Sequence, residues 1–260
     1  MAAGIRIAAA GDIHCDAHRR DEVHAAFGRV AEQADVVLLA GDLTTHGQPE
    51  EAEVLAEVCR DFPLPVVAVL GNHDWHSDRT AELTELLTAA GVTVLDRSSV
   101  VLGIEGVSVG IAGVKGFMGG FGGQMANFGE PLVRQCYAEV TQDVEALTRG
   151  LEQVAGAQIR VALLHYAPIS GTLEGEQPGI WAFLGSERMA APIAAHRPDL
   201  VLHGHAHGGS FEGCIGPVPV YNVAVHVIGR DFWVFDVAPK ERVSERPAAV
   251  EVEEPVSPAS

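Results

Sequence analysis

The chain of 260 residues is 47% hydrophobic and 20% charged, as is typical of a globular protein. Its formal net charge is −18, and its only lysines are Lys115 and Lys240. Because proteins grip nucleic-acid backbones through clustered basic side chains, this balance argues against a long nucleic acid as partner. No apolar run reaches the ~18 residues of a membrane-spanning helix, so no membrane association is expected.

The N-terminal apolar stretch and the cysteines give two expectations about location. Arg6 lies inside the apolar stretch rather than ahead of it, which does not fit a secretory signal peptide. The four cysteines lack the paired spacing of a zinc–thiolate site or a disulfide framework. We therefore expect a cytoplasmic protein with free thiols.

Short apolar runs alternate with helical patterns in the first part of the chain. Near-continuous apolar runs of this length are typical of parallel strands that are covered on both faces. The runs are Ile5–Ala10, Val36–Ala40 and Val66–Leu70, and the helical stretches are Glu22–Gln33, Pro49–Arg60 and Thr80–Ala90. This β-α-β-α-β rhythm predicts a parallel sheet with right-handed crossovers.

The pattern changes after Gly91, where shorter apolar segments are separated by turns. From Val92 to Val114 it predicts antiparallel strands, and near the end of the chain it predicts a second antiparallel set. The predicted elements are strands around Val94, Val100–Leu102 and Val107–Ala112, helix Arg134–Val154, strand Val161–Leu164, helix Ser186–His196, strand Leu200–Leu202, and the final strands Val218–Val223 and Phe232–Val237. Two sheets covered by outer helices is the simplest architecture for this order.

One domain and a tail are predicted. Beyond Ala238 the composition shifts to Pro, Glu, Ser and Val, so we expect residues 1–238 to form the domain and residues 239–260 a disordered tail. Two long loops, Gly116–Gly129 and Tyr166–Gly185, fall inside the domain, where long loops are often functional. The first carries Phe and Met among its glycines, which fits a lid over an apolar part of a substrate, a contact with a second copy, or simple loop packing.

Polar side chains that can bind metal follow five of the predicted strands. Because ligands of open α/β sheets collect at the carboxyl ends of strands, these side chains should converge on one crevice. The segments are Gly11-Asp12-Ile13-His14, Gly41-Asp42, Gly71-Asn72-His73-Asp74, His165 and Gly204-His205-Ala206-His207. Each segment alone is a weak signal, since Gly-Asp after a strand is usually a turn, but five in this order form a strong one.

This ordered set resembles the calcineurin-like metallophosphoesterases, over residues 12 to 207. The resemblance implies an α/β fold, a four-layer αββα sandwich of two mixed β-sheets flanked by helices, with a dinuclear metal site at the strand ends. It further implies that His73 faces the substrate without binding metal. The ligands it implies are Asp12, His14, Asp42 and His207 for the first metal, with Asp42 bridging to a second metal that Asn72, His165 and His205 complete.

The chemistry of these donors agrees with the resemblance. Imidazoles, carboxylates and one amide without any thiolate suit Mn, Fe or Zn, among which affinity order does not choose. Two divalent ions against two carboxylates leave a positive local field, so an acidic protein can still bind a phosphate ester. Two-metal chemistry then predicts attack on phosphorus by a metal-bridging hydroxide, with His73 protonating the leaving oxygen.

One segment departs from a known branch of this superfamily. Its protein phosphatases carry GDxxDRG, whereas residues 41–47 read GDLTTHG. Thr45 stands where an acid would orient the catalytic histidine, and His46 stands where an arginine would bind phosphate. We therefore expect His46 to bind substrate and Asp74 to be the alternative partner of His73. His76 and His226 are further neighbours that could line the crevice.

These observations predict a phosphodiesterase for a small substrate such as a cyclic nucleotide. The alternatives are a phosphomonoesterase of the same superfamily and a non-catalytic binding module on the same fold. A binding module would have lost ligands or the catalytic histidine, and here all seven ligand positions and His73 are filled. The sequence gives no indication of the oligomeric state.

Overall fold

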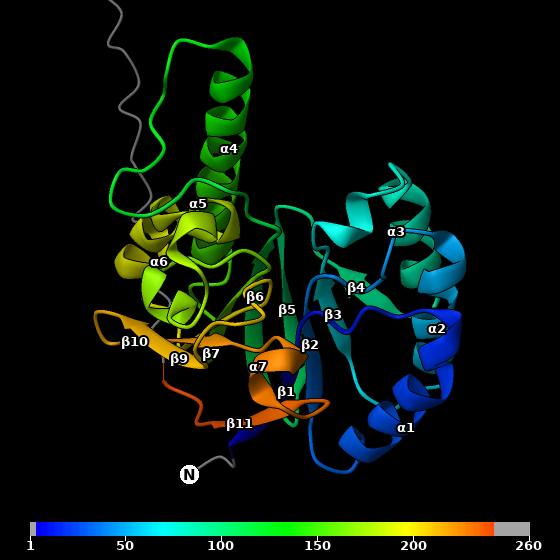
Figure 1. The fold of residues 1–260 in the computed structure, drawn as a ribbon. Coiled ribbons are helices and arrows are strands. Elements are labelled where there is room, and N and C mark those ends of the chain that lie inside the picture. Colours follow the sequence, from blue (N-terminus) through cyan, green and yellow to red (C-terminus); the bar gives the residue numbers. More distant parts are fainter. Residues whose placement is uncertain (1–3, 242–260) are drawn as a thin grey trace, which may run out of the picture.

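The structure, a computed structural model, describes residues 4–241. Two β-sheets pack face to face, with α1, α2 and α3 on the outer side of one and α4 and α6 on the outer side of the other (Figure 1). The helices are α1 (Arg20–Val30), α2 (Pro49–Cys59), α3 (Thr80–Ala89), α4 (Pro131–Gln153), α5 (Trp181–Leu184), α6 (Ala190–His196) and α7 (Val225–Ile228). Short 3₁₀ turns occupy Ala17–Arg19, His73–Trp75, Ser170–Leu173, Pro178–Ile180 and Glu187–Met189.

The first sheet has the strand order β11-β1-β2-β3-β4. Its strands are β1 (Ile5–Ala10), β2 (Val36–Ala40), β3 (Val66–Val69), β4 (Val92–Val94) and β11 (Trp233–Val237). The first three lie where the apolar runs predict them and are parallel, whereas β11 is antiparallel to β1 at the edge. The predicted antiparallel arrangement is wrong for β4, which α3 returns to the sheet as a fourth parallel strand.

The second sheet has the order β5-β6-β7-β8-β10-β9. Its strands are β5 (Ser98–Ile104), β6 (Val107–Val114), β7 (Ile159–Leu164), β8 (Leu200–His203), β9 (Glu212–Ile215) and β10 (Val218–Asn222). The β5–β6 hairpin is antiparallel as predicted. The last two apolar runs do not form one antiparallel set: β10 lies antiparallel to β9 and parallel to β8, whereas β11 joins the other sheet, antiparallel to β1. The short, largely exposed β9 was not predicted.

Three buried apolar layers hold the four structural layers together. Alternate side chains of β1 point to opposite faces, so Ala8 and Ala10 pack toward α1 and α2 while Ile7 and Ala9 pack between the sheets. A third layer joins the outer face of the second sheet to α4 and α6. The two mixed sheets flanked by helices confirm the predicted αββα sandwich.

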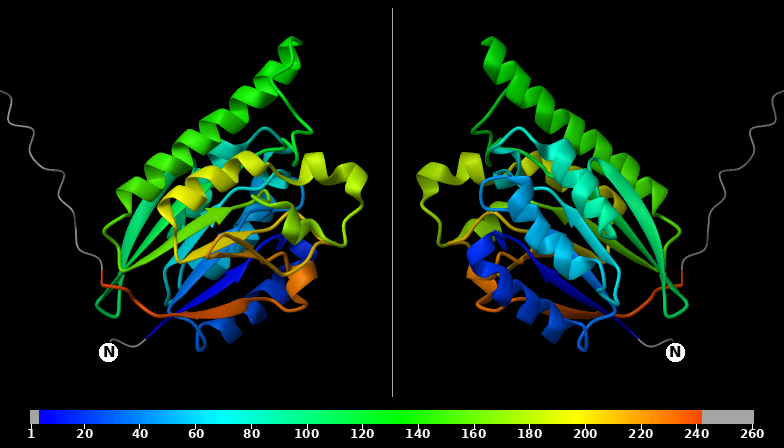
Figure 2. Two further views of the ribbon diagram at one scale, coloured as in Figure 1. Left: turned by 90° about the vertical axis from the view of Figure 1, so that its left-hand side faces the viewer. Right: turned by 90° about the vertical axis from the view of Figure 1, so that its right-hand side faces the viewer.

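Some boundaries differ from the predicted ones. Helix α4 begins at Pro131 rather than Arg134, with proline in the first helical turn. It runs obliquely across the second sheet, and its N-terminal end extends beyond the rest of the domain (Figure 2). The loop Tyr166–Gly185 is not irregular throughout, since two 3₁₀ turns and α5 lie within it.

The start of the predicted tail is held against the second sheet. The backbone N–H of Lys240 donates to the carbonyl oxygen of Gln158, and its ammonium lies 2.6 Å from Asp199. The remainder of the predicted tail, residues 242–260, lies outside the described residues. Within the described part of the chain, no helix is long and apolar enough to cross a membrane.

Candidate metal centre

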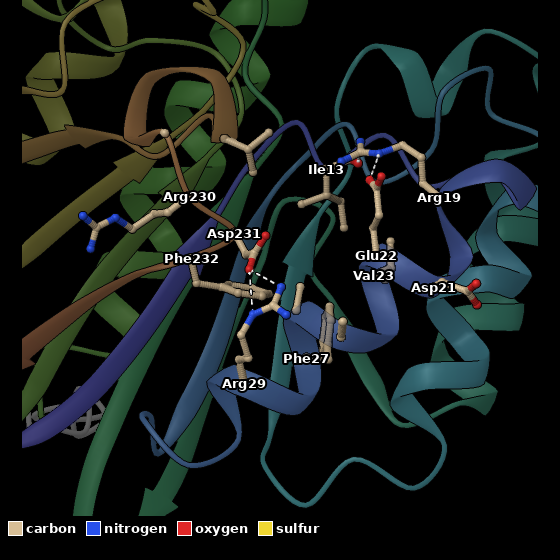
Figure 3. A pocket seen from close by; sticks show the side chains of 14 residues that line it. Ile13, Arg19, Asp21, Glu22, Val23, Phe27, Arg29, Arg230, Asp231 and Phe232 are labelled. Atoms are coloured by element: carbon tan, nitrogen blue, oxygen red, sulfur yellow. Dashed lines mark hydrogen bonds and ion pairs between the residues drawn. The ribbon is translucent and has the colours of Figure 1, made fainter.

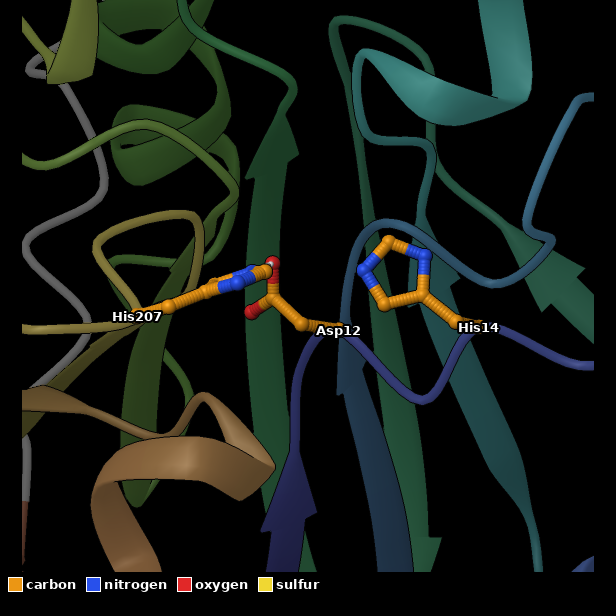
Figure 4. Close-up of side chains that lie close together, drawn as sticks. All are labelled: Asp12, His14 and His207. Atoms are coloured by element: carbon orange, nitrogen blue, oxygen red, sulfur yellow. Dashed lines mark hydrogen bonds and ion pairs between the residues drawn. The ribbon is translucent and has the colours of Figure 1, made fainter.

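The predicted ligands meet where β1, β2, β3, β7 and β8 end. Three groups of side chains each place one donor atom per residue within 4.8 Å of the others. The groups are Asp12, His14 and His207; His14, Asp42 and His73; and Asp42, His165 and His205. Figure 4 shows the carboxylate of Asp12 between the rings of His207 and His14. His14 links the first group to the second and Asp42 links the second to the third, so the three groups form one continuous cluster.

Asn72 joins the cluster beside the third group. Its Oδ1 lies 2.9 Å from Nε2 of His165, and this nitrogen also lies 3.3 Å from Oδ1 of Asp42. Amide oxygen, imidazole nitrogen and carboxylate oxygen therefore face one small volume. All seven predicted ligands are brought together at one edge of the fold.

Backbone carbonyls hold three of the histidine rings and leave one nitrogen of each free to bind metal. Nδ1 of His165 lies 2.8 Å from the carbonyl oxygen of Ala40, and Nδ1 of His14 lies 3.3 Å from that of Thr44. A ring N–H that donates to a carbonyl leaves the lone pair on the other nitrogen, here Nε2. His205 is held in the opposite sense, with Nε2 3.2 Å from the Phe183 carbonyl, which frees Nδ1.

Asp12 and His207 are hydrogen-bonded to each other, with one proton between Oδ1 and Nε2. Oδ1 of Asp12 lies 2.9 Å from Nε2 of His207, and the Asp12 carboxylate also accepts the backbone N–H of His205. Burial opposes ionisation of Asp12, but the hydrogen bond from His207 and the nearby histidines outweigh it and lower its pKa to about 2. The same hydrogen bond raises the pKa of His207. A cation between these two atoms would displace the shared proton.

Glycines next to the ligands make room for them. A Cβ atom at Gly41 would lie 2.5 Å from Nδ1 of His165, and Gly41 also has a φ of +83°. Cβ atoms at Gly71 and Gly204 would overlap the carboxylates of Asp42 and Asp12. These positions require glycine because the carboxylates and the ring pass directly against the backbone.

The backbone is strained at four of the ligands themselves. Asp12, His14, Asp42 and His205 have φ values of +59°, +44°, +50° and +70°. Left-handed backbone is uncommon for residues other than glycine and clusters at functional sites. The folded protein holds these residues in position through the surrounding hydrogen bonds, in a geometry that suits ligand binding.

His73 is oriented by a backbone carbonyl and not by Asp74. Its Nδ1 lies 2.7 Å from the carbonyl oxygen of Thr45, so Nε2 faces the cluster, 3.9 Å from Asp42. The expected pairing of His73 with Asp74 is therefore absent. Thr45 occupies the position of the orienting acid in the protein phosphatases, and its main chain takes over that contact.

Asp74 instead fastens two ligand-bearing loops to each other. Its carboxylate accepts the backbone N–H groups of Leu43, Thr44 and Gly71 and the Thr44 hydroxyl. The side chain is fully buried, and this burial raises its pKa to about 6. Sequence reasoning missed this role, for which the only signal was a second acid in the Gly-Asn-His-Asp segment.

Three further histidines near the motifs, His46, His76 and His226, lie at the surface. Nδ1 of His46 lies 2.8 Å from Glu51, and the side chain is 69% exposed, so the predicted substrate contact would require it to leave Glu51. The ring of His226 stacks on His207 with centroids 4.2 Å apart, and that of His76 lies 4.4 Å from His73. His226 and His76 thus lie directly beside members of the cluster.

A cavity of about 600 Å³ lies beside this centre, between α1 and residues 225–232 (Figure 3). It has an apolar floor that includes Phe27 and Phe232. Two of its arginines are already engaged, Arg19 with the Ile13 carbonyl and Arg29 with Asp231. None of the predicted ligands lines it. The donor atoms for catalysis are in the strand-end cluster and not in this cavity.

Comparison with known proteins identifies the family. The sequence profile of the calcineurin-like phosphoesterases matches residues 5–209. The chain belongs to this family and is a phosphoester hydrolase. The family depends on two metal ions, and the residues present fit such a pair, because donor types, free ring nitrogens and glycine positions all agree. No curated protein matches the chain significantly in sequence.

Solved structures share the fold at low sequence identity. Phosphopantetheinyl hydrolase from Mycobacterium tuberculosis aligns with a TM-score of 0.64 and 18% identity over 90% of this chain and 97% of its own. The protein TT1561 of Thermus thermophilus aligns with a TM-score of 0.55 and 20% identity over 90% and 100%. A putative 5′-nucleotidase from Staphylococcus aureus aligns with a TM-score of 0.57 and 15% identity, over 94% of this chain and 55% of its own.

Proposed function

We propose that the strand-end cluster binds two transition-metal ions and hydrolyses a small phosphodiester, with a cyclic nucleotide as the first candidate. The observation that carries the proposal is the pair of donor groups on either side of Asp42. Asp12, His14 and His207 would hold one ion, and Asn72, His165 and His205 the other. Asp42 would be shared, as in other two-metal hydrolases.

The protein contributes fixed geometry around the reacting phosphate. Two ions bound by these residues would supply an activated hydroxide as nucleophile and positive charge to offset that of the phosphoryl oxygens. The carbonyls of Ala40, Thr44 and Phe183 hold the ligand rings in register. Nε2 of His73, fixed by the Thr45 carbonyl, is the group that would protonate the leaving oxygen, an effect worth about 10²–10⁴-fold.

The net charge of the chain and the names of its structural neighbours support a small substrate. The chain has a formal net charge of −18, which disfavours a long polyanion. The structural neighbours include proteins named as a phosphopantetheinyl hydrolase and a 5′-nucleotidase, names that refer to esters of small molecules. Mn, Fe and Zn all suit the donor set. Cytoplasmic location stays a prediction, which cell fractionation would test.

Hydrolysis of two model esters tests the proposed function. Metal-free protein is assayed on bis-p-nitrophenyl phosphate and on p-nitrophenyl phosphate, before and after addition of Mn²⁺, Fe²⁺ or Zn²⁺. We expect metal-dependent hydrolysis with preference for the diester, and a loss of at least ~10²-fold in kcat for His73→Ala. Preference for the monoester would make the chain a phosphomonoesterase, and inactivity with every metal would favour a binding module.

A further inference from the structure

Lys115 lies at the same sheet edge as the metal ligands and is not used by the mechanism above. It directly follows β6, and its carbonyl oxygen accepts the backbone N–H groups of His165 and Tyr166, each at 3.0 Å. Since β6 and β7 are parallel neighbours in the second sheet, Lys115 is the counterpart of His165 on the adjacent strand. The fold thus fixes a cation beside the second metal position.

Three aromatic rings surround the ammonium of Lys115. Nζ lies 4.9 Å from the ring centroid of Phe117, 5.2 Å from that of Tyr166 and 5.8 Å from that of Trp75. The rings attract the cation without neutralising it. Trp75 belongs to the 3₁₀ turn that begins with His73, so the catalytic histidine and this cage share one short segment.

The positive charge of Lys115 has no carboxylate partner. In residues 4–241 no acidic oxygen lies within ion-pair distance of its Nζ, whose one hydrogen bond goes to the Gly116 carbonyl. The carboxylates with the largest electrostatic effect on Lys115 are Glu139 and Asp143 of α4. Both are bound by Arg97, at 2.5 and 2.6 Å respectively. An ammonium has three donors, and a half-buried one with a single acceptor is suited to receive an anion.

The position of Tyr166 sets where such an anion would lie. The Tyr166 ring lies near both groups, with its centroid 5.2 Å from Nζ of Lys115 and 4.3 Å from the centroid of the His205 ring. The ammonium and a predicted ligand of the second metal therefore share one aromatic neighbour. The scissile phosphate belongs between the metals, so an anion at Lys115 would be a second group on the same substrate, a few bonds away.

We propose that Lys115, held by Trp75, Phe117 and Tyr166, forms an anion subsite that recognises a second phosphate or carboxylate of the substrate. This inference rests on the proposed function and narrows its substrate class to phosphate esters with a further anionic group near the ester that is cleaved. A purely structural cage, in which Lys115 only anchors the start of the 116–129 loop, is the outcome that would overturn it.

Competitive inhibition by a graded series of small esters tests the subsite. Glycerol 3-phosphate, 3-phosphoglycerate and 2,3-bisphosphoglycerate add first a carboxylate and then a second phosphate. Their inhibition constants are measured against bis-p-nitrophenyl phosphate for the Mn²⁺-loaded wild type, Lys115→Met, Lys115→Arg and Lys240→Met. Lys240 is the matched control, since it pairs with Asp199 before β8, at the opposite end of the strands.

We expect the wild type and Lys240→Met to bind 3-phosphoglycerate, 2,3-bisphosphoglycerate or both of these acids at least ten-fold more tightly than glycerol 3-phosphate. Lys115→Met should lose this ratio and Lys115→Arg should keep most of it. The acid that gains affinity identifies carboxylate or phosphate as the second group. Equal constants for all three esters in the wild type, or an unchanged ratio in Lys115→Met, would overturn the subsite.

The ratio separates this inference from the proposed function. General damage to the metal centre weakens the binding of all three esters by a similar factor, which cancels in the ratio of their inhibition constants. Loss of an anion subsite weakens only the binding of the two esters with a second anionic group and therefore changes the ratio. If the wild type hydrolyses no model ester, the proposed function fails. Calorimetric titration of the same three esters into the Mn²⁺-loaded protein then decides the subsite by the same comparison.

Discussion

At the residue scale, the carboxylate of Asp74 connects the loop that carries Asp42 to the loop that carries Asn72. In Asp74→Ala the buried donors of Leu43, Thr44 and Gly71 lose their acceptor, at about 1–3 kcal/mol for each unsatisfied group. We expect a lower urea midpoint and weaker Mn²⁺ binding, with Asp74→Asn in between because it keeps one acceptor oxygen. Wild-type stability and metal affinity in Asp74→Ala would contradict this role.

Gly41 gives a second test at the same scale, with a matched control. An added Cβ would lie 2.5 Å from the His165 ring at a positive φ, so Gly41→Ala must displace this ligand. We expect the variant to bind fewer than two metal ions when titrated calorimetrically with Mn²⁺. Gly28→Ala, in the interior of α1 with nothing within 4 Å of the added atom, should bind metal normally and gain about 0.5–1 kcal/mol of stability.

The side chains of the site could be predicted from sequence more readily than their contacts. The donor residues directly follow predicted strands, most of them after a glycine, and the residue type alone shows that each can bind metal. The orienting group of His73 is the carbonyl of Thr45, an atom that every residue carries, so no letter of the sequence marks it. Asp74 follows His73 directly, and which way two adjacent side chains point depends on backbone angles that the sequence does not show.

At the scale of elements, Arg97 ties α4 to the start of β5. Its guanidinium binds Asp143 and Glu139, and Asp143 is almost fully buried. Arg97→Met should destabilise the protein by less than the ~3–5 kcal/mol of a fully buried pair, since Arg97 is 29% exposed. Burial raises the pKa of Asp143 above its value in the unfolded chain, so the folded protein binds that proton more tightly.

Lowering the pH through this raised pKa therefore favours the folded state at Asp143. Without Arg97 the pKa of Asp143 rises further, because the hydrogen bond and the positive charge of Arg97, which lower that pKa, are gone. We expect the stability deficit of Arg97→Met, measured by urea unfolding, to be larger at pH 8 than at pH 5. If the stability difference between Arg97→Met and the wild type grew toward acidic pH, the destabilisation would not come from Asp143 losing its positively charged partner.

Elements with strong apolar runs could be predicted, and those without could not. Strand β2 is buried and apolar throughout, and β1 and β7 are so except for one arginine each, so all three read as near-continuous apolar stretches. Strand β9 is short, lies at a sheet edge and has only Ile215 buried, so its sequence resembles a loop. The partners of β10 and β11 depend on which sheet each reaches, and turn spacing contains no information about that choice.

At the scale of the whole molecule, the thiols test how the layers are packed. Cys15 and Cys59 are buried between the first sheet and its helices, whereas Cys214 on β9 is exposed. Burial raises the pKa of Cys59 to about 12, and only a thiolate reacts rapidly. With Ellman's reagent at pH 8, we expect Cys214 to react in the native protein and Cys15 and Cys59 only after unfolding. Rapid native reaction of Cys59, mapped by mass spectrometry, would contradict the packing.

The central claim is that one fold edge holds two metal ions around Asp42. The most direct measurement is a crystal structure of the Mn²⁺-loaded protein with anomalous differences recorded for manganese. We predict two peaks on either side of the Asp42 carboxylate, one among Asp12, His14 and His207 and one among Asn72, His165 and His205. A single peak, or peaks away from these residues, would contradict the account.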